Sequence, residues 1–206
     1  MTWRRPSWAP LPLSFQAKEK NVADSLDRLT VTVRPDVPMQ MYTCVQHVMA
    51  LGCVRALRDA GLEAHIVWPA GVAVDGEEAL HVRARAGYEE GLFAEVTLAA
   101  TERGTSLLAQ RRQLLSEALE ASAREWEASL RRAGTVAGPL APVLDEYFSL
   151  LLLAQKEVDV VYPNGNLCAR GVLAGMDVWG RAAVRTASGR VVDISPEQAS
   201  LRGATA

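Results

Sequence analysis

Residues 158–202 read VDVVYPNGNLCARGVLAGMDVWGRAAVRTASGRVVDISPEQASLR, and their apolar residues recur with a period of two. Pro-Asn-Gly at 163–165 and Ser-Gly at 188–189 are turn signals, and a further turn is expected at 177–180. These turns divide the stretch into four or five short strands. The stretch therefore predicts a small C-terminal β-barrel of SH3-like size.

The region before this barrel combines strand and helix patterns. Alternating and β-branched segments predict strands at 29–34, 64–68, 72–74, 79–86 and 92–99. Helical patterns cover residues 39–60, 106–133 and 143–154. The order of these elements predicts an α+β fold in which helices cover one face of a sheet. The expected parts of the chain are an N-terminal arm at 1–28, an α+β domain at 29–155 and the barrel at 156–206.

The overall charge is close to neutral, because 22 basic and 24 acidic side chains give a formal net charge of −2. Such a balance creates no broad positive field, so neither nucleic acid nor an anionic membrane is an expected partner. Three prolines interrupt the first 15 residues, which therefore lack the apolar run of a signal peptide. The longest apolar stretch, 150–154, is too short to span a bilayer. We expect a cytoplasmic protein.

Lysine and glycine are unevenly distributed along the chain. The lysines are Lys18, Lys20 and Lys156, so residues 21–155 contain none, and no glycine precedes Gly52. A glycine-rich phosphate loop near the N-terminus, or a lysine in the body of the domain, therefore has no place in this sequence.

Several motifs follow one another in an order typical of a known family. They are Arg-Pro at 34–35, IVWPAG at 66–71, GTSL at 104–107, QKEV at 155–158, RGVLAGMD at 170–177, Gly-Arg at 180–181 and Ser-Leu-Arg at 200–202. With these motifs the chain resembles the biotin protein ligase family over about 170 residues in one register. The C-terminal family motif is carried by Arg170, Gly175, Asp177 and Gly180.

The resemblance implies a domain related to class II aminoacyl-tRNA synthetases and lipoate ligases, with a mixed sheet, followed by an SH3-like barrel. Members of the family activate biotin with ATP to biotinyl-5′-AMP and transfer it to a lysine of a carrier domain. Biotin and ATP with Mg²⁺ are thus the implied ligands, provided that the family activity is retained. A biotin carrier domain is an implied partner, and so is a second copy of the chain, since family members often pair through sheet edges.

The sequence departs from the family where phosphate would be handled. The family's glycine-rich arginine loop would fall at 15–28, which contains no glycine. Val67 stands at the position of the family's lysine, and Ala-Gly at 70–71 replaces Asn-Asp. A later lysine segment falls at 77–82, which offers Glu77 and Glu78, and carboxylates repel a triphosphate. We therefore assign no catalytic residue.

What remains is a remnant ligand pocket. Its candidate residues are Trp68, Pro69, Gly71, Arg83 and Arg85. Trp68 either fills the core or stacks on a ligand. Arg83 and Arg85 share a strand face with His81, and this face either supplies positive charge to the pocket or is simply solvated.

Two further groups of residues have both a functional interpretation and one that involves no ligand. Lys18, Lys20 and Arg28 are candidate replacement phosphate contacts, or charges of a solvated N-terminal segment. Cys44 and His47 have the i,i+3 spacing of two metal ligands, but the sequence offers no second pair. A buried cysteine beside a hydrogen-bonded histidine is the favoured interpretation, and no metal site is assigned.

Three hypotheses for the function follow. The favoured one is a divergent relative of biotin protein ligase that lacks adenylation activity and serves as a ligand-binding or assembly protein. The second is an active ligase, which attaches biotin or a related acid to a carrier-domain lysine and uses the charges of the arm. The third is an interaction module whose pocket is filled by side chains. An open cleft near Trp68 bordered by arginine favours ligand binding.

Overall fold

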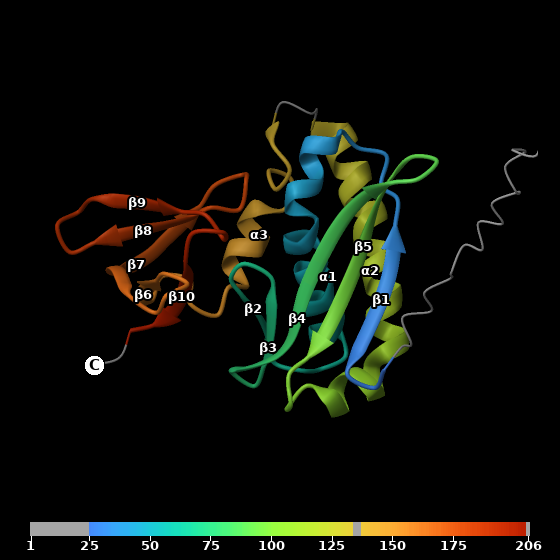
Figure 1. The fold of residues 1–206 in the computed structure, drawn as a ribbon, viewed down its shortest axis with the longest axis horizontal. Helices are drawn as coiled ribbons and strands as arrows, with labels where there is room; N and C mark the ends of the chain where they lie inside the picture. The colour runs from blue at the N-terminus through green and yellow to red at the C-terminus, as the bar shows by residue number, and fades with distance from the viewer. Residues whose placement is uncertain (1–24, 134–136, 205–206) are drawn as a thin grey trace, which may run out of the picture.

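The computed structural model describes residues 25–133 and 137–204, which form two five-stranded sheets connected by helices (Figure 1). The elements up to the third helix are β1 (Arg28–Val33), η1 (Met39–Cys44), α1 (Val45–Asp59), β2 (Ala64–Val67), β3 (Gly71–Val74), β4 (Glu77–Tyr88), β5 (Leu92–Ala100), α2 (Thr105–Ala133) and α3 (Leu144–Ser149). The remaining elements are β6 (Glu157–Val161), β7 (Leu167–Met176), β8 (Ala182–Thr186), β9 (Val191–Ile194) and β10 (Ser200–Gly203).

The first sheet has the strand order β1-β5-β4-β3-β2, and each neighbouring pair is antiparallel. A parallel contact is added by an isolated bridge between Ile66 and Leu151. Helices α1 and α2 cover one face of this sheet, behind the strands in Figure 1. Alternate residues of β1 and β5 are buried beneath them: Leu29, Val31, Val33, Ala94, Val96 and Leu98. The predicted α+β arrangement with helices on one face is confirmed.

The opposite face of the first sheet is exposed. In β4, Leu80 and Val82 are buried, whereas His81, Arg83 and Arg85 are exposed. This alternation follows from the pleat of a strand, which turns successive side chains to opposite faces. The expected sharing of one face by these three polar residues is confirmed.

The second sheet has the order β10-β6-β7-β8-β9, and all of its pairs are antiparallel. Its buried residues include Val158, Val160, Leu173, Val184 and Leu201. The turn glycines Gly165, Gly180 and Gly189 all have positive φ angles, which glycine adopts without steric cost. The predicted small C-terminal β-structure is confirmed, while β9 and β10 remain the end strands of the sheet. Closure into a barrel, and the division of the chain near residue 155, stay predictions.

The helix predicted at 143–154 is wrong over its second half. Helix α3 ends at Ser149, because the main chain beyond it bonds to β2: Ile66 N donates to Leu150 O, and Leu152 N donates to Ile66 O, both at 2.8 Å. The helix predicted at 39–60 is divided, since its first six residues form the 3₁₀-helix η1. No helix within the described ranges is long and apolar enough to cross a membrane.

Candidate functional site

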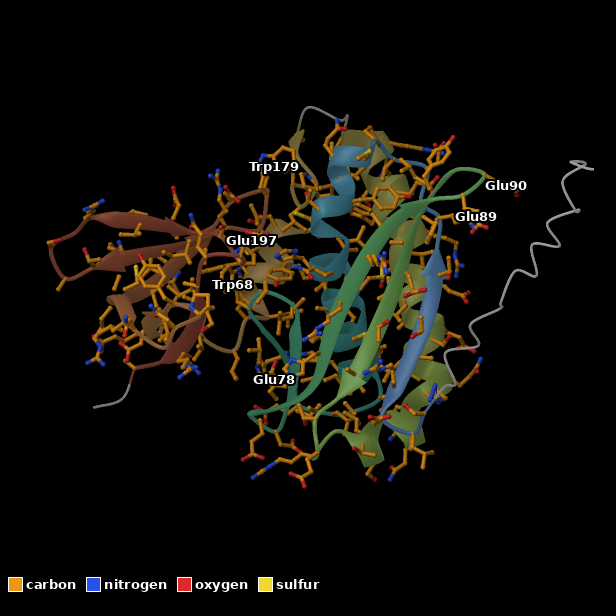
Figure 2. The ribbon with its side chains drawn as sticks, viewed as in Figure 1. Trp68, Glu78, Glu89, Glu90, Trp179 and Glu197 are labelled. Carbon is orange, nitrogen blue, oxygen red and sulfur yellow. The ribbon has the colours of Figure 1, made fainter. Side chains whose placement is uncertain are left out.

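Trp68 lies at the junction of the two sheets, immediately after β2 (Figure 2). Its side chain is buried, and its indole Nε1 donates a hydrogen bond of 3.0 Å to the carbonyl oxygen of Gly180, in the turn between β7 and β8. The hydroxyl of Tyr147, on α3, donates to the carbonyl oxygen of Pro69. The Trp-Pro sequence is therefore fixed from two sides, and Trp68 connects the first sheet to the second.

The turn that receives Trp68 is stabilised by hydrogen bonds to the carboxylate of Asp177. One carboxylate oxygen of Asp177 accepts from the backbone N–H groups of Trp179 and Arg181, each at 2.9 Å, and the other accepts from Arg181 Nε at 2.6 Å. Gly180 follows with a φ of +87°. A Cβ atom at this glycine would lie 2.6 Å from Nε2 of His47, so the turn packs directly on α1.

His47 is the buried polar residue at this contact. It is 1% exposed, and its ring centroid lies 5.7 Å from that of Tyr147. Burial lowers the pKa of His47 to about 4, although the Glu197 carboxylate and the Cys44 backbone act in the opposite direction. Burial also raises the pKa of the Cys44 thiol to about 11. Both side chains are therefore neutral near pH 7 and buried, as expected. The expected hydrogen bond of the histidine is wrong, because neither ring nitrogen of His47 has a hydrogen-bond partner in the described part of the chain.

A groove of about 620 Å³ lies beside Trp68, between the first sheet and the strand β10 of the second. It is lined by Gln46, Val67, Trp68, Pro69, Ala70, Gly71, Glu78, His81, Val82, Arg83, Pro196, Ser200, Leu201 and Arg202. Arg83 comes from β4 and Arg202 from β10, so each sheet supplies one arginine to the lining of the same groove. Trp68, Val82 and Leu201 supply apolar surface.

The acidic side chain in this groove is Glu78. Its carboxyl carbon would lie 3.1 Å from a Cβ atom at Gly71, so the carboxylate covers the backbone just after the Trp-Pro sequence. One of its oxygens lies 3.0 Å from Nδ1 of His81. Glu77 points elsewhere and pairs with Arg103. A carboxylate in this position repels polyphosphate, so the residues of the groove do not fit ATP with Mg²⁺.

The structure brings four of the five predicted pocket residues together. Trp68, Pro69, Gly71 and Arg83 line the groove, whereas Arg85 lines a separate concavity with Tyr88 and Phe93 near the β4–β5 turn. Of the candidate phosphate contacts, Lys18 and Lys20 lie outside the described residues. Arg28 begins β1, where its carbonyl oxygen accepts from Arg112 Nη2 at 2.6 Å, and it is not among the groove residues.

The four residues of the C-terminal motif make contacts within the second sheet or at its junction with the first. Arg170 forms a bidentate pair with Asp159 across β6 and β7, with 2.8 Å between Nη2 and Oδ2. Gly175 lies at a register shift between β7 and β8. Asp177 and Gly180 form the turn described above. In this motif, Gly180 is therefore the residue that reaches the junction and contacts Trp68 and His47.

Sequence reasoning missed several residues of the groove: Gln46, Pro196, Ser200 and Arg202. Ser200 and Arg202 belong to the closing Ser-Leu-Arg motif, which was recognised for the fold. Nothing in the spacing of the sequence, however, places Arg202 in the same groove as a residue 119 positions earlier, Arg83. Among the described residues, no cluster of three or more His, Cys, Asp or Glu side chains is arranged to hold a metal ion.

An α+β unit with helices on one face, followed by a small antiparallel β-unit and a groove between them, defines the architecture. No family model matches the sequence, and no curated protein matches it. Among solved structures, the chain is similar to the biotin protein ligase of Aquifex aeolicus in complex with biotin and ATP, with a TM-score of 0.63 and 16% identity over 86% of this chain and 78% of that one.

The apo form of the same Aquifex aeolicus ligase gives a TM-score of 0.61 with 16% identity, over 86% of this chain and 82% of the other. A second structure of that ligase gives a TM-score of 0.55 with 15% identity, over 86% and 82%. The chain thus has the fold of a biotin protein ligase, with a strongly diverged sequence.

Proposed function

We propose that this protein binds a small organic ligand in the groove beside Trp68 and does not form an acyl-adenylate. The observation that carries the proposal is the groove itself, which is open at about 620 Å³ and bordered by Arg83 and Arg202. Pockets for small molecules typically measure about 300–1,000 Å³ and combine apolar walls with a few polar groups. A pocket filled by side chains would have offered no such volume.

The proposed lack of adenylation follows from the charges that the chemistry requires. Negative charge builds up on the phosphates as pyrophosphate leaves, and catalysis needs cations or N–H donors directed at it. Residues 21–155 contain no lysine, and the groove presents Glu78 beside the Trp-Pro sequence. Lys156 lies immediately before β6 and is not a groove residue. These features support binding without activation of the ligand.

The direct test is calorimetric titration with biotin and with a non-hydrolysable biotinyl-AMP analogue, together with an assay for pyrophosphate release from ATP. We expect biotin to bind without ATP and no pyrophosphate to be released. Ser200→Trp should block the groove and abolish binding, whereas Ser188→Trp, at the exposed β8–β9 turn, should leave it unchanged. Failure of both compounds to bind would remove the proposal.

The same assay distinguishes this proposal from the alternative hypothesis of an active ligase. Biotin-dependent pyrophosphate release, with transfer to a carrier-domain lysine, would establish it. In that case the double variant Lys18→Ala and Lys20→Ala should abolish transfer, because those residues would supply the phosphate contacts. A cytoplasmic location and a carrier-domain partner belong to this proposal as predictions.

A second candidate function is assembly through the free edge of β4. Strand β3 pairs with β4 only as far as His81, and Val82 N then donates to Ala70 O at 2.9 Å. In the described part of the chain, residues 83–88 of β4 have a strand neighbour on the β5 side alone. Free strand edges pair readily with another strand. We propose that a second copy of the chain pairs there.

Sedimentation velocity tests this assembly. The wild-type protein should sediment as a dimer at micromolar concentration. Ala84→Pro should give a monomer, because proline removes an N–H donor and is tolerated at a sheet edge. Retained ligand binding by Ala84→Pro would show that the variant is folded. A monomeric wild-type protein, or a dimeric variant, contradicts pairing at this edge.

A further inference from the structure

His47 is a buried titratable side chain that the proposed function does not use. It belongs to α1 and is 1% exposed, and neither of its ring nitrogens has a hydrogen-bond partner within residues 25–133 and 137–204. Buried side-chain nitrogens are nearly always hydrogen-bonded, because an unpaired polar group in an apolar site has lost its bonds to water. The unpaired ring therefore weakens the structure at the point where the two sheets meet.

The turn between β7 and β8 covers the ring on its Nε2 side. A Cβ atom at Gly180 would lie 2.6 Å from Nε2 and 2.8 Å from Cε1, so the main chain of Gly180 packs directly on this edge of the ring. The carbonyl oxygen of the same residue accepts the hydrogen bond from Trp68 Nε1. The part of the second sheet that covers His47 is thus also the part that Trp68 holds.

The titratable groups that face His47 from the side of the first sheet are neutral at pH 7. Burial raises the pKa of the Cys44 thiol in η1 to about 11, and it raises the pKa of the Tyr147 phenol in α3 well above its ordinary value. The Cys44 backbone favours a protonated ring without meeting hydrogen-bond geometry. An imidazolium has two N–H donors, so a protonated ring in this position would be buried with both donors unpaired.

The carboxylates near this contact belong to the second sheet. Asp177 already accepts three hydrogen bonds within its turn, from Trp179 and Arg181. Glu197 follows β9, is exposed and lies at the junction (Figure 2). Its charge favours the protonated form of His47, although no hydrogen bond joins the two residues. A protonated ring therefore gains water and the Glu197 carboxylate as partners only if the turn moves off α1.

We infer that His47 is an acid-sensitive switch that releases the contact between the two sheets. When the ring takes up a proton from solvent, the β7–β8 turn separates from α1, Trp68 loses its bond to Gly180, and the second sheet moves away from the first. The groove beside Trp68 is lined from both sheets, so it opens at the same time. The first sheet and its helices stay folded during this opening. The inference does not depend on whether a ligand occupies the groove.

Hydrogen exchange at two positions of the full chain tests the switch. NMR follows the indole N–H of Trp68, identified by its absence from Trp68→Phe, and the backbone N–H of Val96, which is buried in β5. Because local opening needs less free energy than complete unfolding, Trp68 should have an opening constant at least about tenfold larger than that of Val96 at pH 7. Between pH 7 and pH 5 the constant at Trp68 should rise about 20-fold, since the pKa of His47 is about 4 when buried and 6.5 when free.

Two variants remove the titrating ring, and a third serves as the control. In His47→Gln and His47→Leu the opening constant at Trp68 should differ by less than about twofold between pH 7 and pH 5. Protection of Val96 shows that each variant is folded, and the wild-type comparison of Trp68 with Val96 stands without either variant. His65→Gln is the control, because His65 in β2 also has an unpartnered buried nitrogen and does not lie beneath the turn. It should retain the 20-fold rise.

The outcomes decide the inference independently of ligand binding. Equal opening constants at Trp68 and Val96 at both pH values would mean that only complete unfolding exposes the indole, and the switch would be wrong. A wild-type opening constant that does not change with pH, or a rise that persists in a folded His47 variant, also contradicts it. A rise at Trp68 that both His47 variants abolish and His65→Gln retains supports the switch.

Discussion

Gly180 combines a left-handed backbone with a close approach between the two sheets. Its φ is +87°, and a Cβ atom there would lie 2.6 Å from His47 Nε2 and 2.8 Å from Cε1. Any side chain therefore meets both backbone strain and the His47 ring. Gly189 separates these two effects, because its φ of +81° is similar but nothing lies within 4 Å of its Cβ position.

We predict that Gly180→Ala lowers the free energy of unfolding by about 3 kcal/mol, while Gly189→Ala costs about 1–2 kcal/mol from backbone strain alone. Chemical denaturation of both variants measures the difference. The contact with His47 is responsible for the extra loss. Equal destabilisation by the two substitutions would show that the contact between position 180 and His47 adds nothing to the loss of unfolding free energy.

We predict that His47 makes the stability of the protein depend on pH. Its folded-state pKa of about 4 lies below the ordinary value of 6.5, so between these values the unfolded chain binds a proton that the folded protein excludes. The contribution of the neutral ring is fully present above pH 6.5 and is lost as pH falls toward 4, by about 3 kcal/mol in total. The other groups near the ring are the Cys44 thiol, the Tyr147 phenol and the Glu197 carboxylate.

Denaturation curves at pH 5 and pH 7 test this dependence. We expect the wild-type protein to lose about 2 kcal/mol of stability between pH 7 and pH 5 through this residue, consistent with linkage at 1.36 kcal/mol per pH unit. His47→Gln should show a correspondingly smaller loss, whatever its absolute stability. If His47→Gln loses as much stability between pH 7 and pH 5 as the wild-type protein does, His47 is not the titrating group.

At the level of elements, α1 and α2 are in close contact because Gly52 faces Ser122. A Cβ atom at Gly52 would lie 2.8 Å from the Ser122 Cβ atom and closer still to its hydroxyl. Gly52→Ala should therefore destabilise the protein by about 2–3 kcal/mol, because overpacking forces the helices apart. Ser122→Gly alone should cost about 1 kcal/mol as a glycine in a helix interior.

The double variant Gly52→Ala with Ser122→Gly tests whether this contact sets the helix spacing. This double variant moves the glycine from α1 to α2 and keeps one small residue at the contact. It should recover at least half of the unfolding free energy lost in Gly52→Ala, so the effects of the two changes should not be additive. Thermal unfolding of the four proteins in the cycle provides the coupling energy. Additive losses would mean that the Ser122 side chain is not the reason why position 52 requires glycine.

The elements that local pattern could predict are those whose burial alternates regularly. The pattern of β1 and the stripe of α2 both appear in the sequence, and both elements begin within one residue of the predicted position. The apolar run at 150–154 predicts a helix, because a short apolar run is equally compatible with a helix and with an extended segment. Its main chain instead bonds to Ile66 at the edge of β2, a partner more than 80 residues away that no local pattern reveals.

The candidate site was predictable only where it follows a motif. Trp68, Pro69 and Gly71 are adjacent in the sequence, and Arg83 lies on a strand whose alternation is regular. Arg85 shares that alternation but lies two residues farther along β4, and at a rise of about 3.3 Å per residue it reaches another concavity. Arg202 enters the groove through the packing of one sheet on the other, which depends on long-range contacts.

At the scale of the whole molecule, the junction contains both the groove and the bonds that hold the sheets together. Trp68 lines the groove and donates to Gly180, and Tyr147 binds Pro69 from the other side. Backbone bonds add to this contact, since Leu140 N donates to Val178 O at 3.0 Å. A change in the groove is therefore expected to alter the coupling of the two sheets.

Trp68→Phe tests this coupling. The substitution removes the indole N–H and leaves the Gly180 carbonyl without its donor, at a cost of about 1–3 kcal/mol. Because that bond joins the sheets, we expect calorimetry to show the second sheet melting in a separate, earlier transition, whereas the wild-type protein melts in one.

Tyr42→Phe is the control, since it removes a buried bond of 2.8 Å to Pro35 O within the first unit. It should lower the melting temperature and preserve a single transition. A single transition in Trp68→Phe would show that the backbone bonds alone couple the sheets, and the groove could then change shape without loosening them.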